Sequence, residues 1–177
     1  MLEAFRGESY QKVDSKARVL IPAGFRKVLA AADPVTSDNP RPRVVMIYGD
    51  KRRNFVECYT VVDAAAMEQR IRALPEGDKW RKVLEVNMIS MSLTVEVDED
   101  GRLVLPPRVR EKLGLTAEEM KDGVETAFTG LLDKFQIWKR ATYDRDIRQV
   151  AEDVLDELPA DMDILSLLSG ARPGGRD

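Results

Sequence analysis

One short sequence pattern occurs twice in this chain, and this internal repeat constrains the fold more than any other feature. The first copy runs from Asp14 to Arg26, and the second runs from Asp98 to Arg110. Each copy holds Asp, Arg, Pro and Arg at intervals of four residues, and each of these residues in the first copy matches one 84 positions later. Such a repeat indicates one supersecondary unit that is used twice. Because each copy places an arginine directly after a tight turn, the repeat also marks two positions from which a side chain can contact a large anion.

Both copies predict the same order of elements, which is a strand, a turn, a strand, a helix and a hairpin. For the first copy we expect a turn at 14–17, a strand at 19–21, a helix at 22–32, a loop at 33–42 and hairpin strands at 44–48 and 54–60. For the second copy we expect a strand at 93–97, a turn at 98–101, a strand at 102–105, a helix at 106–113 and hairpin strands at 124–129 and 134–138. Proline suits the start of both helices because its missing N–H has no partner there, and Gly114 suits the end of the second helix.

Three more helices are expected outside the repeats. Apolar residues at helical spacing predict them at 62–74, 78–91 and 142–158. The apolar positions of the last helix are Ile147, Val150, Val154 and Leu158. Beyond Pro159, the apolar segment 164–168 is a candidate for docking against another surface.

Each copy of the repeat is too short to bury a sufficient hydrophobic core alone. We therefore expect one domain made from two interleaved halves rather than two independent domains. The expected division is a first repeat at 1–61, a helical connector at 62–91, a second repeat at 92–141, and a C-terminal helix with an acidic, partly mobile tail at 142–177.

The composition argues against most catalytic and metal sites. The chain has no histidine and a single cysteine, Cys58, which we interpret as a small apolar residue of a strand. Without histidine or clustered cysteines there is no plausible zinc site and no Ser-His or Cys-His nucleophile pair. We therefore expect no metal, no cofactor and no enzyme activity, although the many carboxylates leave a carboxylate-based enzyme formally open.

The distribution of apolar residues predicts a cytoplasmic protein. No stretch approaches the ~18 consecutive apolar residues of a membrane span, and Met1–Gly7 lacks the apolar core of a secretory signal. One cysteine cannot form an intrachain disulfide, which fits a reducing compartment.

The net charge of −3 argues against a uniformly basic nucleic-acid binder, but the charges are unevenly distributed. Residues 1–60 hold 11 basic and 7 acidic side chains, a charge of +4, whereas residues 141–177 hold 4 basic and 9 acidic ones, a charge of −5. A basic face with an acidic tail produces this asymmetry. Scattered solvated charges account for the same counts equally well.

Several recurring residues of the repeat have structural explanations. Asp14 and Asp98 can accept backbone N–H groups within their turns. Arg26 and Arg110 are expected to pair with a carboxylate and so lock the two halves together. A structural role is therefore favoured over a binding role for these residue types at this spacing.

Arg18 and Arg102 are the stronger binding candidates because each begins a strand at an exposed turn. A guanidinium group suits bidentate contact with a phosphate or with the edge of guanine. Lys16 adds a positive charge in the first copy, whereas Asp100 stands at the matching position of the second copy and repels phosphate. The two halves are therefore expected to contribute unequally.

The residues around both copies resemble the MraZ family. The resemblance is carried by Phe5-Arg6-Gly7, 13–22 and Phe25-Arg26 in the first half, and by the 98–110 pattern with Phe135–Trp138 in the second half. It covers about residues 1–145, and the doubled motif makes it specific.

The resemblance implies an α+β fold, a pseudo-two-fold β-barrel of the SpoVT/AbrB swapped-hairpin type, built from two tandem repeats with additional helices. It implies a transcriptional regulator that assembles into a homo-oligomeric ring and acts, nucleoid-associated, on double-stranded DNA repeats in the promoter of its own division and cell-wall gene cluster. The resemblance implies neither a membrane nor a small-molecule substrate as a partner. The residues that the resemblance assigns to DNA contact are Asp14, Lys16, Arg18, Asp98 and Arg102.

Three features depart from the family pattern. Ala17 stands where the family has glycine, so the first turn must form without that conformational freedom. The loop at 33–43 is enlarged, and the acidic tail beyond about residue 145 has no clear counterpart in the family.

Three other functions stay open at the level of the sequence. The first is an antitoxin-like barrel whose acidic tail wraps a partner protein, which the fused repeat disfavours. The second is a scaffold protein whose basic turns bind no nucleic acid. The third is an enzyme that uses Asp98, Glu99 and Asp100 around a divalent cation, although this segment lacks the ligand spacing of an EF-hand.

Overall fold

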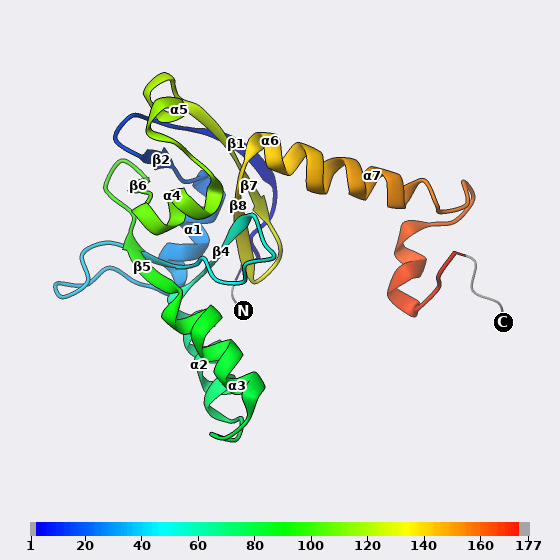
Figure 1. Ribbon diagram of the computed structural model, residues 1–177, viewed down its shortest axis with the longest axis horizontal. Coiled ribbons are helices and arrows are strands. Elements are labelled where there is room, and N and C mark those ends of the chain that lie inside the picture. The colour runs from blue at the N-terminus through cyan, green and yellow to red at the C-terminus, as the bar shows by residue number, and fades with distance from the viewer. Residues whose placement is uncertain (1–2, 174–177) are drawn as a thin grey trace. The chain divides into compact units, whose positions relative to one another are not determined.

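Strands from the two repeats are interleaved within the first of two structural units of this protein. The computed structural model describes residues 3–173, which divide after Arg140 into two units that are described separately below (Figure 1). Residues 174–177, part of the tail expected to be mobile, lie outside the described residues. The architecture is a mixed α+β one in which every strand pairing is antiparallel.

The larger sheet of the first unit has six strands whose order is symmetric between the repeats. In spatial order they are β1 (Glu8–Val13), β7 (Val124–Gly130), β8 (Lys134–Lys139), β4 (Phe55–Tyr59), β3 (Arg43–Ile47) and β5 (Ser92–Glu96). Strands β1 and β5 are equivalent in the two repeats, and so are the hairpins β3–β4 and β7–β8. If each strand is replaced by its equivalent in the other repeat, the result is the same strand order listed from the opposite edge of the sheet. The first strand of each repeat pairs with the hairpin of the other, so the two halves are interleaved.

The smaller sheet pairs β2 (Arg18–Leu20) with β6 (Arg102–Val104), one strand from each repeat (Figure 1). Its register places Val19 directly opposite Leu103. These two residues occupy the same position of the repeat, 84 residues apart. A pseudo-two-fold axis therefore passes between them, and the rest of the register obeys it: Arg18 faces Val104, and Leu20 faces Arg102.

One hydrophobic core is filled from both repeats, since neither could bury enough apolar surface alone. Four phenylalanines from both halves lie at its centre, with ring centroids 4.9 to 6.5 Å apart: Phe5, Phe25, Phe128 and Phe135. Cys58 is fully buried in β4, where burial raises the pKa of its thiol, which confirms its interpretation as an apolar strand residue.

The helices that follow the small sheet confirm the predicted boundaries to within one residue. They are α1 (Ala23–Ala32) and α4 (Pro107–Leu113). Helix α4 ends at Gly114, which has a left-handed backbone with φ of +70°, as a glycine C-cap requires. The hairpins and the loop before β3 also lie where the sequence predicts them.

The connector between the repeats is helical, as predicted. It consists of α2 (Val61–Arg72), α3 (Lys79–Leu84) and the π-helical turns η1 (Glu85–Ser90), which continue α3. A further helix, α5 (Ala117–Asp122), was not anticipated. Its sequence signal is the capping box formed by Thr116 and Glu119.

The second unit begins at Ala141, one residue before the predicted C-terminal helix at 142–158. This helix is built from α6 (Arg140–Tyr143), η2 (Asp144–Arg148) and α7 (Gln149–Leu155), and a short 3₁₀ helix, η3 (Ile164–Ser169), follows. Within residues 3–173, no helix has the length and apolar character needed to cross a membrane.

Asp33 anchors both ends of the loop that precedes β3. Its carboxylate is only 5 % exposed. It accepts hydrogen bonds from the backbone N–H, Nε and Nη2 of Arg43, each at 2.9 Å, and from Nδ2 of Asn39 at 2.8 Å. The hydrogen bonds from the Arg43 side chain are the main reason that the pKa of Asp33 lies below its ordinary value of 3.8.

The turns that enter β2 and β6 have the same backbone but different side-chain surroundings. Ala17 has a φ of +60° and the matching Gly101 a φ of +78°. Alanine thus adopts the left-handed conformation without the freedom of glycine, at a cost of about 1–2 kcal/mol. The Ala17 side chain is buried in the core. A Cβ atom on Gly101 would instead lie 2.4 Å from Nη1 of Arg26, so the two turns are not interchangeable.

We predict that Gly101→Ala lowers the free energy of unfolding by about 1–2 kcal/mol, because it adds a left-handed alanine and displaces the Arg26 guanidinium. Urea denaturation measures the change. In the matched control Ala17→Gly, relief of backbone strain nearly cancels the loss of a buried methyl group worth ~0.8 kcal/mol. A Gly101→Ala protein as stable as the wild type would contradict the assignment.

We predict that Asp33→Ala lowers the free energy of unfolding at pH 7 by about 2–3 kcal/mol, because it leaves the Arg43 donors unpaired. A carboxyl group whose folded pKa is depressed stabilises the protein above its unfolded pKa and loses this effect as the pH falls through the folded value. The difference between wild type and variant should therefore shrink below about pH 3.8. Asp38→Ala, at an exposed position of the same loop, is the control and should change stability by less than about 0.5 kcal/mol.

Candidate nucleic-acid interface

The small sheet has one buried face and one exposed face. Because side chains alternate along a strand, Val19 and Leu103 point inward, and they are 1 % and 2 % exposed. The four remaining side chains of β2 and β6 share the outer face: Arg18, Leu20, Arg102 and Val104. The sheet is therefore a two-stranded ribbon that presents two arginines and two aliphatic residues outward. We call this surface the ribbon face.

The two arginines of the ribbon face are close together and related by the pseudo-two-fold axis. Arg18 lies opposite Val104, which is two residues beyond Arg102, so the arginines are diagonal neighbours. Diagonal neighbours in an antiparallel pair are about 7–8 Å apart. The register thus brings together two residues that are 84 positions apart in the sequence.

Each arginine is positioned by the aspartate that opens its turn. Oδ1 of Asp14 accepts the backbone N–H groups of Lys16 at 3.0 Å and Arg18 at 2.9 Å. In the second copy, the same atom of Asp98 accepts the equivalent backbone N–H groups of residues 100 and 102, both at 2.9 Å. The predicted structural role of both aspartates is confirmed. Their assignment to DNA contact stays a prediction, and the geometry gives them a positioning role.

The two arginines differ in their partners. Arg18 donates from Nε to Oδ2 of Asp14 at 2.8 Å, in an ion pair whose side chains are both about 40 % exposed. Burial acts to raise the pKa of Asp14, but hydrogen bonds from Arg18 and Lys16 outweigh it and hold the pKa below its ordinary value. Arg102 is exposed, and within residues 3–173 no carboxylate forms an ion pair with it.

A positive charge that the sequence analysis missed lies beside the second turn. Nη2 of Arg41, in the enlarged loop, is 3.9 Å from Oε1 of Glu99. Arg26 packs its guanidinium against Gly101 in the same turn. These two arginines offset part of the repulsion that Asp100 was expected to exert on phosphate. The position of Arg41 depends on how the loop folds back, and no sequence motif marks it.

The expected locking of the halves by Arg26 and Arg110 through carboxylates is wrong. Within the described part of the chain, neither arginine forms an ion pair, and the Nε atom of each is buried without a hydrogen-bond partner. The halves are joined instead by the backbone. The N–H of Ile21 donates to the carbonyl of Gly101 at 2.9 Å, and the N–H of Leu105 donates to the carbonyl of Ala17 at 2.8 Å.

Known proteins resemble this chain over nearly its whole length. A protein from Cereibacter sphaeroides named "Transcriptional regulator MraZ" is 53 % identical over 168 residues, which cover 95 % of this chain and 97 % of that protein. A protein of the same name from a Ruegeria species is 47 % identical over 94 % of this chain and 96 % of that protein. One from Shewanella amazonensis is 26 % identical over 85 % of this chain and 89 % of that protein.

A family model also matches the chain, over residues 88–164, and it is described as "MraZ protein, putative antitoxin-like". This match extends well beyond residue 145, so the expectation that the acidic tail lacks a counterpart in the family is wrong. Together with identities near 50 % over almost the full length of both proteins, these matches show that the chain belongs to the MraZ family, whose similar members are named transcriptional regulators.

Proposed function

We propose that this protein is a sequence-specific DNA-binding transcriptional regulator that contacts DNA with the ribbon face. The observation that carries this proposal is the outward placement of Arg18 and Arg102 on two paired strands whose opposite side chains are buried in the core. The rigid core beneath the ribbon holds both guanidinium groups in defined positions. Defined positions are what sequence readout requires.

The shape and chemistry of the ribbon face suit the major groove of DNA. That groove is about 12 Å wide and admits a two-stranded β-ribbon. Arg18 uses only Nε in its hydrogen bond to Asp14, so its terminal nitrogens can reach the O6 and N7 atoms of guanine or a phosphate. Lys16 is exposed in the adjacent turn and adds a phosphate contact.

Several copies acting together would overcome the weak binding of one subunit. A chain of net charge −3 neutralises few phosphates, and non-specific affinity depends on the number neutralised. We propose that the protein forms a ring-shaped homo-oligomer whose ribbon faces bind successive repeats in the promoter of its own division and cell-wall gene cluster. A second contact on the same DNA then benefits from a high effective concentration.

The remaining parts of the proposal follow from the interleaved topology and from family membership. We propose that the two sheets are parts of a swapped-hairpin barrel, and that the division into two repeats, a connector and a C-terminal segment describes the domain. The site of action would be the nucleoid in the cytoplasm. The strand order, which is symmetric between the repeats, and the register of β2 with β6 support the barrel proposal.

We predict that Arg18→Ala and Arg102→Ala each weaken binding to the DNA upstream of the gene by about 10- to 100-fold, since a bidentate arginine contributes about 1–3 kcal/mol. Fluorescence anisotropy at several salt concentrations measures this loss. If an arginine contacts phosphate, the slope of log K against log salt should also fall by about one for each contact removed.

Two further variants make this test specific. Arg72→Ala removes an exposed arginine of α2 that lies outside the ribbon face, and it should leave affinity unchanged. Arg102→Lys keeps the charge but loses the planar fork, so it should restore binding only where the contact is to phosphate. If both ribbon-face alanine variants bind with wild-type affinity, the proposed interface is wrong.

A further inference from the structure

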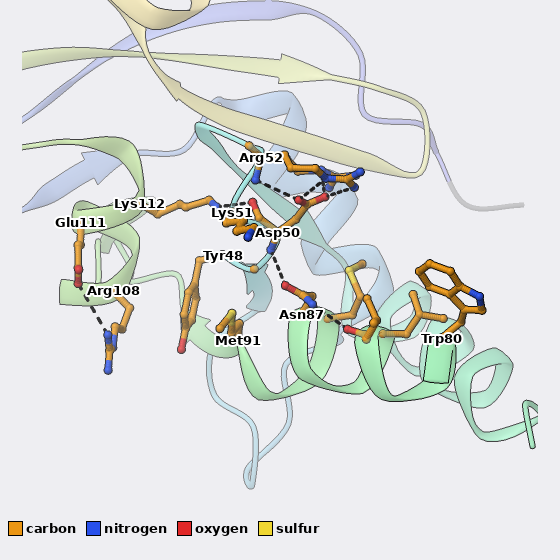
Figure 2. A pocket seen from close by; sticks show the side chains of 15 residues that line it. Tyr48, Asp50, Lys51, Arg52, Trp80, Asn87, Met91, Arg108, Glu111 and Lys112 are labelled. Atoms are coloured by element: carbon orange, nitrogen blue, oxygen red, sulfur yellow. Dashed lines mark hydrogen bonds and ion pairs between the residues drawn. The ribbon is translucent and has the colours of Figure 1, made fainter. Parts of the chain in front are cut away.

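A groove of about 960 Å³ lies between the β3–β4 turn, the helix formed by α3 and η1, and helix α4 (Figure 2). Figure 2 shows Arg108 and Lys112 at one end of this groove and Trp80 at the other, with Asn87 and Met91 between them. We call it the connector groove. It belongs wholly to the first unit, and the proposed DNA contact does not use it.

The connector groove is held in shape by specific contacts. The backbone N–H of Asp50 donates to Oδ1 of Asn87 at 2.9 Å, and Nζ of Lys112 donates to the carbonyl of Asp50 at 2.7 Å. A Cβ atom on Gly49 would lie 1.9 Å from the carbonyl oxygen of Asn87, so the turn sits directly against η1. Three separate elements are thus fixed around one hollow.

One part of the groove is apolar and open to water. Trp80 is 63 % exposed, Val83 46 % and Met91 39 %. Exposed aromatic and methionine side chains of this kind are enriched in protein interfaces, where tryptophan often contributes most of the binding energy. Nζ of Lys79 lies 5.1 Å from the centre of the Trp80 ring, in cation–π contact with it.

The other part of the groove is basic. Two carboxylates, Asp50 and Glu111, line it together with five cationic side chains, so its formal charge is +3. The cationic side chains are Lys51, Arg52, Arg53, Arg108 and Lys112. An apolar floor beside a positive rim fits a segment that is apolar on one face and acidic on the others.

The C-terminal helix has this character. Ile147, Val150 and Val154, at spacings of three and four, are 39 %, 52 % and 56 % exposed. Residues 141–173 hold eight carboxylates and three arginines, a charge of −5. Apolar residues at such spacing are the anchors by which an amphipathic helix binds a hydrophobic groove.

We propose that the connector groove of one copy binds the C-terminal helix of a second copy, with Trp80 packed against Val150 and Val154. The inference rests on the proposed homo-oligomer and names the surface that forms it. Contact between two different surfaces is heterologous, and such contacts generate a ring when the rotation between copies closes.

Charge favours this pairing over the symmetric alternatives. Two grooves that face each other would juxtapose two positive rims, and two C-terminal helices would juxtapose two acidic segments. Like charges across an interface cost several kcal/mol. Groove against C-terminal segment instead brings the charge of +3 to the charge of −5 of residues 141–173, of which −2 lies in the helix at 141–155, and covers the apolar surface of both.

The test uses one variant for each side of the contact, examined by light scattering coupled to size exclusion. Trp80→Asp disables the groove and keeps the helix, whereas the double variant Val150→Asp/Val154→Asp disables the helix and keeps the groove. We expect a wild-type oligomer larger than a dimer and a monomer for each variant alone. An equimolar mixture should give a heterodimer, because one intact groove then meets one intact helix.

Two controls separate the contact from folding. Val35→Asp, at a position 61 % exposed in the loop before β3, and Leu168→Asp, at one 85 % exposed in η3, add the same charge outside the proposed contact. Both should assemble as the wild type does. Far-ultraviolet circular dichroism at 25 °C should give all variants the wild-type spectrum, since each substituted side chain is exposed.

Every other result overturns the inference, and each one identifies which claim is wrong. Variants that assemble like the wild type show that another surface forms the oligomer, which leaves the proposed assembly intact. A mixture that stays monomeric shows that the intact groove and the intact helix do not bind each other. A monomeric wild type removes the proposed assembly itself, whereas anisotropy on a DNA duplex with one repeat still tests the ribbon face separately.

Discussion

The antiparallel pairing of β2 with β6 is the contact on which the rest of this structure depends. Each strand has only three residues, too few to be stable alone, and each comes from a different repeat. Val19 and Leu103 insert from this pair into the shared core, and the backbone hydrogen bonds of Ile21 and Leu105 extend the pairing into the turns. Because the inner face is occupied by the core, the arginines have only the outer face available. The interaction that joins the halves is therefore also the one that presents the proposed DNA contact.

The symmetry of the backbone does not extend to the charges that surround it. Arg18 is held by Asp14, whereas Arg102 has only a backbone-binding aspartate behind it and acidic side chains beside it. Arg41 and Arg26 approach the second turn and bring positive charge that the repeat itself does not encode. If the ribbon face binds DNA as proposed, its unequal halves can contact two different half-sites. This differs from a true homodimer, in which both halves must be identical.

The proposed assembly and the proposed contact between groove and helix together give a structural explanation for the uneven charge along the chain. Basic residues of the β3–β4 turn and of α4 line the connector groove, and the acidic segment comprises the C-terminal helix and the residues that follow it. If copies join through these surfaces, the ribbon faces are repeated around the assembly. Weak individual contacts then combine, because the effective concentration of the second contact is high. Assembly and DNA binding would in this way depend on separate surfaces.

The local elements follow from the sequence, because proline, glycine and apolar spacing act over a few residues. Pro22 and Pro106 precede the helices, Gly114 ends one, and the 84-residue repeat indicated two interleaved halves. Even α5 carried a readable capping box. Three features emerge only from the tertiary packing. They are the pairing of β1 with β7, the approach of Arg41 to Glu99, and the lack of carboxylate partners for Arg26 and Arg110 among the described residues. These contacts join residues far apart in the chain, and they depend on how the shared core packs, which no local pattern specifies.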